Sequence, residues 1–104
     1  MKKIPDFNKA NTALVIIDMQ YEGSPDGYWK TYNWDSTVQN SKKVLDACRK
    51  KGIPVVHVVV ARDPNGVHCH PFDVRDEHGK PIYSVKGTEK AEIIDELKPI
   101  RGEM

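Results

Sequence analysis

Two apolar runs dominate the pattern of hydrophobic and polar positions. Residues 13–17 are apolar without interruption, and the run stops abruptly at Asp18. A run of this length without polar alternation is typical of a strand buried on both faces of a parallel sheet. Three successive β-branched residues favour a strand over a short core helix. The second run, PVVHVVVA, begins at Pro54 and is closed by Arg62 and Asp63.

Between the two runs, apolar side chains recur at helical spacing. Asp35 or Ser36 can cap a helix that runs to about Lys51, and Gly52 provides a left-handed stop. The apolar stripe consists of Val38, Ser41, Leu45 and Cys48, with Val44 and Ala47 alongside. Residues 12–61 therefore form a predicted βαβ unit, whose right-handed crossover makes the two strands parallel. Asp18 and the Arg62–Asp63 pair then open onto the same edge of the sheet.

The other segments are irregular, except one near the C-terminus. Residues 1–11 are a predicted lead-in, and Gly23, Pro25 and Gly27 make residues 21–33 a loop. Residues 62–86 form a second, long loop of a kind that is usually functional or disordered. Thr88 can cap a final helix over residues 87–98, which Pro99 ends. The pattern predicts one small α/β domain over residues 1–104.

Asp18 is the main candidate for chemistry. It follows the first strand at its carboxyl end, where ligand crevices form in open α/β sheets. The alternative is a turn former or helix cap, because Asp is common in turns. Aromatic residues in the loop after it suit either the wall of a substrate pocket or an anchor that packs the loop onto the body or a partner chain. The candidates for substrate contacts are Gln20, Tyr28, Trp29 and Trp34.

Histidines offer a weaker signal. The long loop contains His68 and His70, but two such residues alone are weak evidence for a metal, since metal sites usually need more ligands from defined elements. His57, inside the second run, is expected to be a buried histidine with its hydrogen bonds satisfied. We therefore predict neither a metal nor a cofactor.

Composition narrows the function classes. Lys plus Arg is 16 against 15 for Asp plus Glu, which argues against a nucleic-acid or anionic-membrane binder driven by bulk charge. No apolar run approaches the roughly 18 residues of a membrane span. The N-terminal segment lacks the apolar region of a signal peptide. Cys48 and Cys69 are then expected to be free thiols in a reducing compartment, with the cytoplasm as the default.

Three segments in order carry a family resemblance: TALVIIDMQ, KKGIPVVHVVVARDPNG and KGTEKAEIIDELKPIRGE. Their order and spacing resemble the N-terminal half of an isochorismatase-like cysteine hydrolase, a family that includes nicotinamidases, N-carbamoylsarcosine amidases and ureide or biuret hydrolases. The strongest elements are DMQ at 18–20, G-x-P at 52–54 and GT at 87–88. The resemblance implies the first half of a three-layer α/β/α Rossmann-like parallel sheet.

The resemblance also implies a catalytic triad of Asp, Lys and Cys. Asp18 matches the Asp, the general base that takes the thiol proton before the thiolate attacks an amide carbonyl. The family's Lys lies on the strand after the GT helix and its Cys at the start of a later helix, positions that residues 1–104 do not contain. Cys48, Cys69 and Lys86 belong to other elements and do not match. The Asp-x-His pattern of a nicotinamidase metal site is replaced by Asp-Pro-Asn at 63–65.

Two parallel strands and two helices leave a sheet edge and a sheet face uncovered, which invites pairing with another chain. We expect a complementary chain with the C-terminal half, either a separate subunit or a cleavage product, in an oligomer. One function is then half of a hydrolase for a small-molecule amide or ureide. The alternative is a non-catalytic binding or oligomerisation module. The sequence does not identify the substrate.

Overall fold

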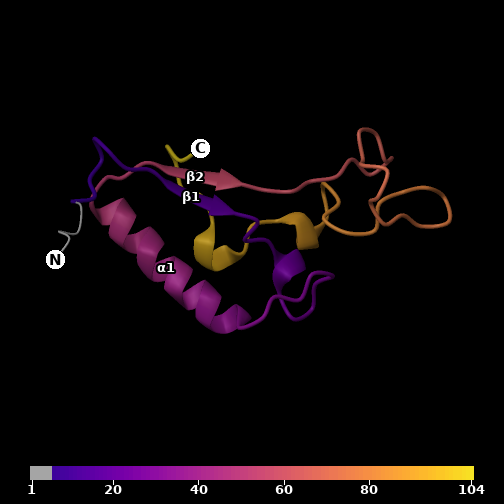
Figure 1. Cartoon of the computed structure of the whole chain (residues 1–104), viewed down its shortest axis with the longest axis horizontal. Helices are drawn as coiled ribbons and strands as arrows, with labels where there is room; N and C mark the ends of the chain where they lie inside the picture. Colours follow the sequence, from indigo (N-terminus) through magenta and orange to yellow (C-terminus); the bar gives the residue numbers. More distant parts are fainter. Residues whose placement is uncertain (1–5) are drawn as a thin grey trace.

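The computed structural model describes residues 6–104; residues 1–5 of the predicted lead-in lie outside them. Within these described residues there are two strands and one α-helix, with three short 3₁₀ turns (Figure 1). In chain order these elements are β1 (Leu14–Ile17), a turn at Tyr21–Gly23, α1 (Trp34–Lys50), β2 (Val55–Val58), and turns at Glu89–Ala91 and Asp95–Leu97. Among these helical elements, none has the length and apolar content that crossing a membrane requires.

The two strands are parallel neighbours, which confirms the predicted α/β class. Their register runs from Leu14 opposite Val55 to Ile17 opposite Val58. On the other edge of β2, Met104 donates its N–H to the Val55 oxygen at 3.2 Å. Its own oxygen accepts the His57 N–H at 2.8 Å. The chain therefore returns at Met104 to the free edge of β2.

Helix α1 ends as expected but begins differently. Gly52 has a φ of +71°, and the Ile53 N–H bonds back to the Cys48 oxygen, so this residue is the left-handed stop. At the start, the cap position is Asn33, which itself has a φ of +53° and makes no side-chain cap bond. Asp35 and Ser36 lie inside the first turn, so the prediction that one of them caps the helix is wrong.

One face of the sheet is covered and the other is open. α1 and the turn at Asp95–Leu97 lie on the same side of the strands (Figure 1). The core on this side consists of Ile16, Leu45, Val55, Ile94 and Leu97. On the opposite face, Val15, Ile17 and Val58 are 49%, 60% and 43% exposed. The expectation that the first strand is buried on both faces is therefore wrong for this chain, because none of the described elements covers the second face.

The helix predicted for residues 87–98 is replaced by two single 3₁₀ turns. The backbone between them is extended and pairs with the chain after β1: Tyr21 donates to the Glu92 oxygen and Ile94 to the Met19 oxygen, each at 3.1 Å. An α-helix would need the same groups for its own ladder. Thr88 does not cap; its hydroxyl donates to the Val85 oxygen.

The overall shape is elongated. The radius of gyration is 16.5 Å, compared with roughly 13 Å expected for a compact domain of this length. Residues 62–86, called the arm below, extend beyond the carboxyl end of β2 (Figure 1). The chain thus has an incompletely covered sheet and a long arm at the strand ends where Asp18 lies.

Candidate active site

A cavity of about 260 Å³ lies at the carboxyl ends of the strands. Its walls come from the end of β1 with the loop after it, from the end of β2 and from the arm. The lining residues are Asp18, Gln20, Glu22, Gly23, Trp29, Thr31, Val60, Arg62 and Ser84. The prediction that Asp18 and Arg62 open onto the same edge is confirmed. We call this hollow the Asp18 cavity.

Asp18 occupies a strained backbone position with an unengaged carboxylate. Its φ is +59°, a left-handed value that is uncommon outside glycine and that Asp tolerates better than most residues. Its N–H still donates to the Val58 oxygen at 2.8 Å, which prolongs the parallel ladder. Within residues 6–104 the carboxylate accepts no hydrogen bond, so it neither caps a helix nor closes a turn there. Ser84, across the cavity, is a second left-handed residue with a φ of +49°.

Gln20 lines the cavity, but its side-chain amide is hydrogen-bonded to backbone groups. Its oxygen accepts the Val60 N–H at 2.9 Å, and its nitrogen donates to the Val60 oxygen at 2.7 Å and the Ala91 oxygen at 2.6 Å. The side chain thus imitates a strand residue and is 3% exposed. Its amide therefore links the segments that follow β1 and β2 to the C-terminal segment.

Glu22 is a buried carboxylate that sequence reasoning missed. One oxygen accepts the Tyr28 N–H at 2.7 Å and the other accepts the Ser84 N–H at 2.8 Å. The side chain therefore ties the loop after β1 to the arm. Gly27 permits this arrangement, because a Cβ there would overlap the Glu22 backbone. The sequence carries little signal for this role, since a Glu in a Gly-rich loop is normally solvated.

The aromatic side chains of the loop form a cluster with the arm. Tyr28 stacks on Tyr83 with centroids 4.8 Å apart, and Trp29 packs edge-on against both rings. Arg62 lies over the Tyr83 ring at 4.2 Å and pairs with Asp73 at 3.2 Å. That hydrogen-bonded guanidinium holds the pKa of Asp73 below its ordinary value. The cluster fixes Trp29 and Arg62 as walls of the Asp18 cavity.

The structure separates the predicted contact residues. Gln20 and Trp29 line the Asp18 cavity, and Tyr28 lies beside Trp29 on Tyr83. Trp34 is elsewhere: as the first residue of α1 it packs against the core, and it lines a separate hollow with Pro25 and Asn33. The prediction of Trp34 as a wall of the same pocket is therefore wrong.

His68 and His70 of the arm line a larger hollow of about 540 Å³ together with Cys69, Arg62 and Lys86. His70 stacks on Phe72 with centroids 4.9 Å apart. Over residues 6–104 the structure has no group of three or more His, Cys, Asp or Glu side chains arranged to hold a metal ion.

Comparison with known proteins decides the family. A sequence profile of the Isochorismatase domain matches residues 12–104. The chain belongs to the isochorismatase family. It is 34% identical over 90 residues to YddQ, an uncharacterized isochorismatase family protein of Bacillus subtilis (strain 168), covering 85% of this chain and 48% of that protein. Proteins named as hydrolases are among its relatives.

Solved structures agree with this assignment. An isochorismatase family protein from Desulfovibrio vulgaris superposes with a TM-score of 0.74 at 33% identity, covering 88% of this chain and 48% of that one. N-carbamoylsarcosine amidase from Thermoplasma acidophilum superposes with a TM-score of 0.64 at 30% identity, covering 88% and 47%. The chain thus has part of the isochorismatase fold, and it spans about half the length of the family members it matches.

Proposed function

We propose that this chain is one half of an isochorismatase-like hydrolase that cleaves an amide-type C–N bond, with Asp18 as its general base. The observation that carries the proposal is the unengaged carboxylate of Asp18 in a cavity at the strand ends, on backbone held at a φ of +59°. Strained backbone is retained where the surroundings over-determine it, commonly at active sites. The likeness to an amidase supports an amide substrate.

The chemistry needs two further groups. A thiolate attacks the carbonyl carbon while Asp18 takes the thiol proton, and an ammonium nearby stabilises both anions. The C–N bond then breaks, the amine leaves with the proton returned by Asp18, and water hydrolyses the thioester to release the acid and restore the thiol. In the residues that the structure describes, the walls of the Asp18 cavity include neither a lysine nor a cysteine. The Lys and Cys therefore come from a polypeptide segment outside these 104 residues.

The shape of the chain supports completion by such a segment. β1 has no strand on its outer side within residues 6–104. The hollow between that edge and α1 has about 360 Å³ and a largely apolar lining that includes Leu14, Val15, Ile17 and Val44. An exposed strand edge with apolar surroundings is a template for another strand. We propose that the C-terminal half of the fold, as a separate subunit or a cleavage product, occupies it in a cytoplasmic oligomer.

Gln20, Tyr28 and Trp29 stay candidates for substrate contacts, with different roles. Gln20 shapes the wall of the cavity but offers no free amide, because its amide is already hydrogen-bonded to the backbone. Trp29 contributes an aromatic wall, with Tyr28 holding it from behind through the Tyr83 stack. A flat amide or ureide of small size suits a cavity of about 260 Å³.

The test is Asp18→Asn in the natively purified material. Asn tolerates a left-handed φ as well as Asp does, so the fold is retained. Ammonia release from a panel of primary amides and N-carbamoyl compounds should fall by about 10²–10⁴-fold, the usual contribution of a general base. Asp26→Asn, an exposed carboxylate in the same loop, is the matched control and should leave turnover unchanged.

A binding or oligomerisation module is the second candidate, favoured by the absence of a thiol and an amine from the walls of the Asp18 cavity as residues 6–104 form it. It predicts that Asp18→Asn changes neither partner binding nor any hydrolysis. If the natively purified material shows no thiol-dependent hydrolysis, the binding or oligomerisation module is supported and the hydrolase is contradicted.

A further inference from the structure

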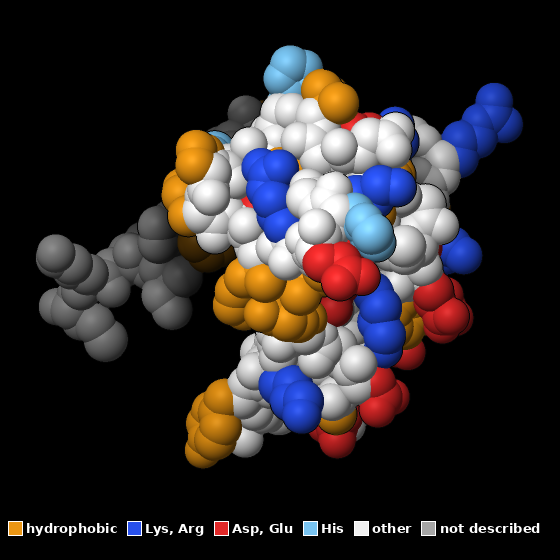
Figure 2. Space-filling model, turned by 90° about the vertical axis from the view of Figure 1, so that its right-hand side faces the viewer, with side chains coloured by type: hydrophobic (Ala, Val, Ile, Leu, Met, Phe, Trp, Pro, Cys, Tyr) orange, Lys and Arg blue, Asp and Glu red, His pale blue; other side chains and the backbone are white. Residues whose placement is uncertain are grey.

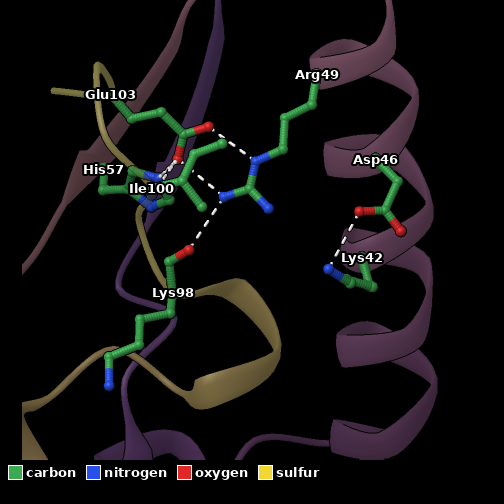
Figure 3. A network of polar contacts seen from close by, with 7 residues as sticks. All are labelled: Lys42, Asp46, Arg49, His57, Lys98, Ile100 and Glu103. Carbon is green, nitrogen blue, oxygen red and sulfur yellow. Dashed lines mark hydrogen bonds and ion pairs between the residues drawn. The ribbon is translucent and has the colours of Figure 1, made fainter.

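A buried ionic cluster joins α1, β2 and the C-terminal segment (Figure 3). Both carboxylate oxygens of Glu103 accept hydrogen bonds from Arg49, at 2.8 Å from Nε and 2.9 Å from Nη2. The Nε2 of His57 lies 2.9 Å from the same carboxylate. The side chains of Glu103 and His57 are only 8% and 3% exposed. Two neighbouring elements and a C-terminal segment distant from both in sequence therefore meet on one carboxylate.

The cluster also grips the backbone that leads to Met104. The Ile100 N–H donates to Glu103 Oε1 at 3.2 Å, and Arg49 Nη2 donates to the Lys98 oxygen at 3.0 Å (Figure 3). Charged, forked hydrogen bonds of this kind are the strong ones and fix geometry as well as contributing energy. Residues 98–103 are thereby held against both α1 and β2.

The charge states are consistent with a permanent contact. Arg49 and His57 lower the pKa of Glu103 to about 2, so the carboxylate is ionised throughout the physiological range. An ionised carboxylate only accepts, so His57 Nε2 carries the proton. The ring's Nδ1 is buried and has no hydrogen-bond partner among residues 6–104. The hydrogen bonding of His57 is thus only half satisfied, contrary to the expectation that it is complete.

Met104, the residue after Glu103, pairs with the free edge of β2. Met104 bonds to both Val55 and His57, which puts it opposite Val56. Val15 is the partner of Val56 on the other side, and Asp18 follows Val15 by three residues. In a strand that continued from Met104 along β2, the third residue further on would therefore fall in the row of Asp18. A slip of one residue would turn every following side chain to the opposite face of the sheet.

We propose that the Arg49–Glu103–His57 cluster is a register lock, whose three side chains are positioning residues that hold Met104 opposite Val56 and so set the register of any strand that continues from Met104 beside β2. By fixing Glu103, the cluster fixes which residue of that strand shares the row of Asp18. This inference deepens the proposed function, on which its catalytic meaning rests. The lock itself requires neither turnover nor a substrate.

Amide hydrogen exchange of the natively purified material tests the lock. The two bonds that define the register involve the amides of His57 and Met104, and the amide of Leu45 reports on the α1 core. In Glu103→Gln, exchange at His57 and Met104 should rise by about tenfold or more while Leu45 changes by less than about threefold, as expected for local opening. The control is Lys42→Gln, which breaks the exposed 3.1 Å pair with Asp46 on the same helix. This control should change none of the three amides.

A second variant covers the case in which Glu103→Gln does not fold. Arg49→Lys keeps the charge but loses the fork, so it should raise exchange at the same two amides by a smaller factor. Unchanged exchange at His57 and Met104 in these variants would overturn the proposal. Equal acceleration of all three amides would also overturn it, since the cluster would then contribute only to global stability. If Asp18→Asn does not reduce hydrolysis while Glu103→Gln still raises exchange selectively at His57 and Met104, the proposed function is refuted and the lock stands.

Discussion

Adjacent isoleucines on β1 lie in opposite environments. Ile16 points into the core and is 8% exposed, while Ile17, one residue later, is 60% exposed. The pattern repeats on β2, where Val55 is buried and Val58 is exposed. In the space-filling view hydrophobic side chains reach the surface in several places (Figure 2). Both faces of the two strands therefore carry apolar side chains, but residues 6–104 cover only one of these faces.

The open face has an energetic consequence. Fully burying an exposed Val or Ile side chain is favourable by about 1.5–3 kcal/mol. Val15, Ile17 and Val58 together therefore offer a driving force of several kcal/mol for a second layer, before the entropy of association is subtracted. The variants below change the covered face, its polar links and the open face in turn.

The largest effect is expected on the covered face. Ile16→Ala removes a side chain that packs in the cluster with Leu45 and Leu97, and it should lower the free energy of unfolding by about 2–5 kcal/mol. Urea unfolding followed by circular dichroism measures the change. A loss below about 1 kcal/mol would mean that this face is not a packed core.

The next effect concerns the polar link between the strands. Gln20→Leu fills similar space but leaves Val60 without its two bonds and Ala91 without its donor, so the free energy of unfolding should fall by about 2 kcal/mol or more. Gln39→Leu on the exposed part of α1 is the control and should stay within about 0.5 kcal/mol. Equal losses in the two variants would contradict the link.

A pH effect of intermediate size is expected from Glu103. Its pKa is lowered to about 2 in the folded chain, so its contacts stabilise fully above its ordinary pKa of 4.5. This contribution is lost progressively as the pH falls from there toward 2. The difference in unfolding free energy between the chain and Glu103→Gln should therefore shrink on acidification, and the comparison cancels the similar contribution of Asp73. If this difference in unfolding free energy stays constant over this pH range, the predicted contribution of Glu103 is refuted.

The smallest effect on the chain itself is expected on the open face. Ile17→Ser should change the free energy of unfolding of the isolated chain by less than about 0.5 kcal/mol, because the side chain is already exposed. The same variant should weaken association with the completing polypeptide by about tenfold or more. Native mass spectrometry at several concentrations measures this association. A variant that destabilises the isolated chain as much as Ile16→Ala would erase the distinction between the two faces.

Much of the fold could be predicted, because local patterns determine it. The β-branched runs gave both strands, and the apolar stripe with Gly52 gave the helix and its end. The helix predicted for residues 87–98 is wrong, because pairing of residues 92–94 with the chain after β1 overrides a helical stripe of Ile94 and Leu97. Those two side chains are nevertheless buried, so the pattern identified the core but not the backbone conformation.

The candidate site was partly predictable. Asp18 was found because a carboxylate follows a buried strand directly, and the structure brings it to a cavity with Trp29 and Arg62. Glu22 and Tyr83 were missed because their partners lie about 60 residues away in the chain, beyond any local pattern. Trp34 was misplaced because an aromatic at a helix start looks the same in sequence whether it faces a pocket or the core.

The central claim is that Asp18 acts with a Lys and a Cys from outside these 104 residues. Native mass spectrometry of the natively purified material, naming every polypeptide present, tests it most directly. The account predicts a complex, or a covalently longer chain, that contains a Lys-bearing strand and a Cys at a helix start. A species made only of the 11.8 kDa chain, alone or with identical copies, would contradict it.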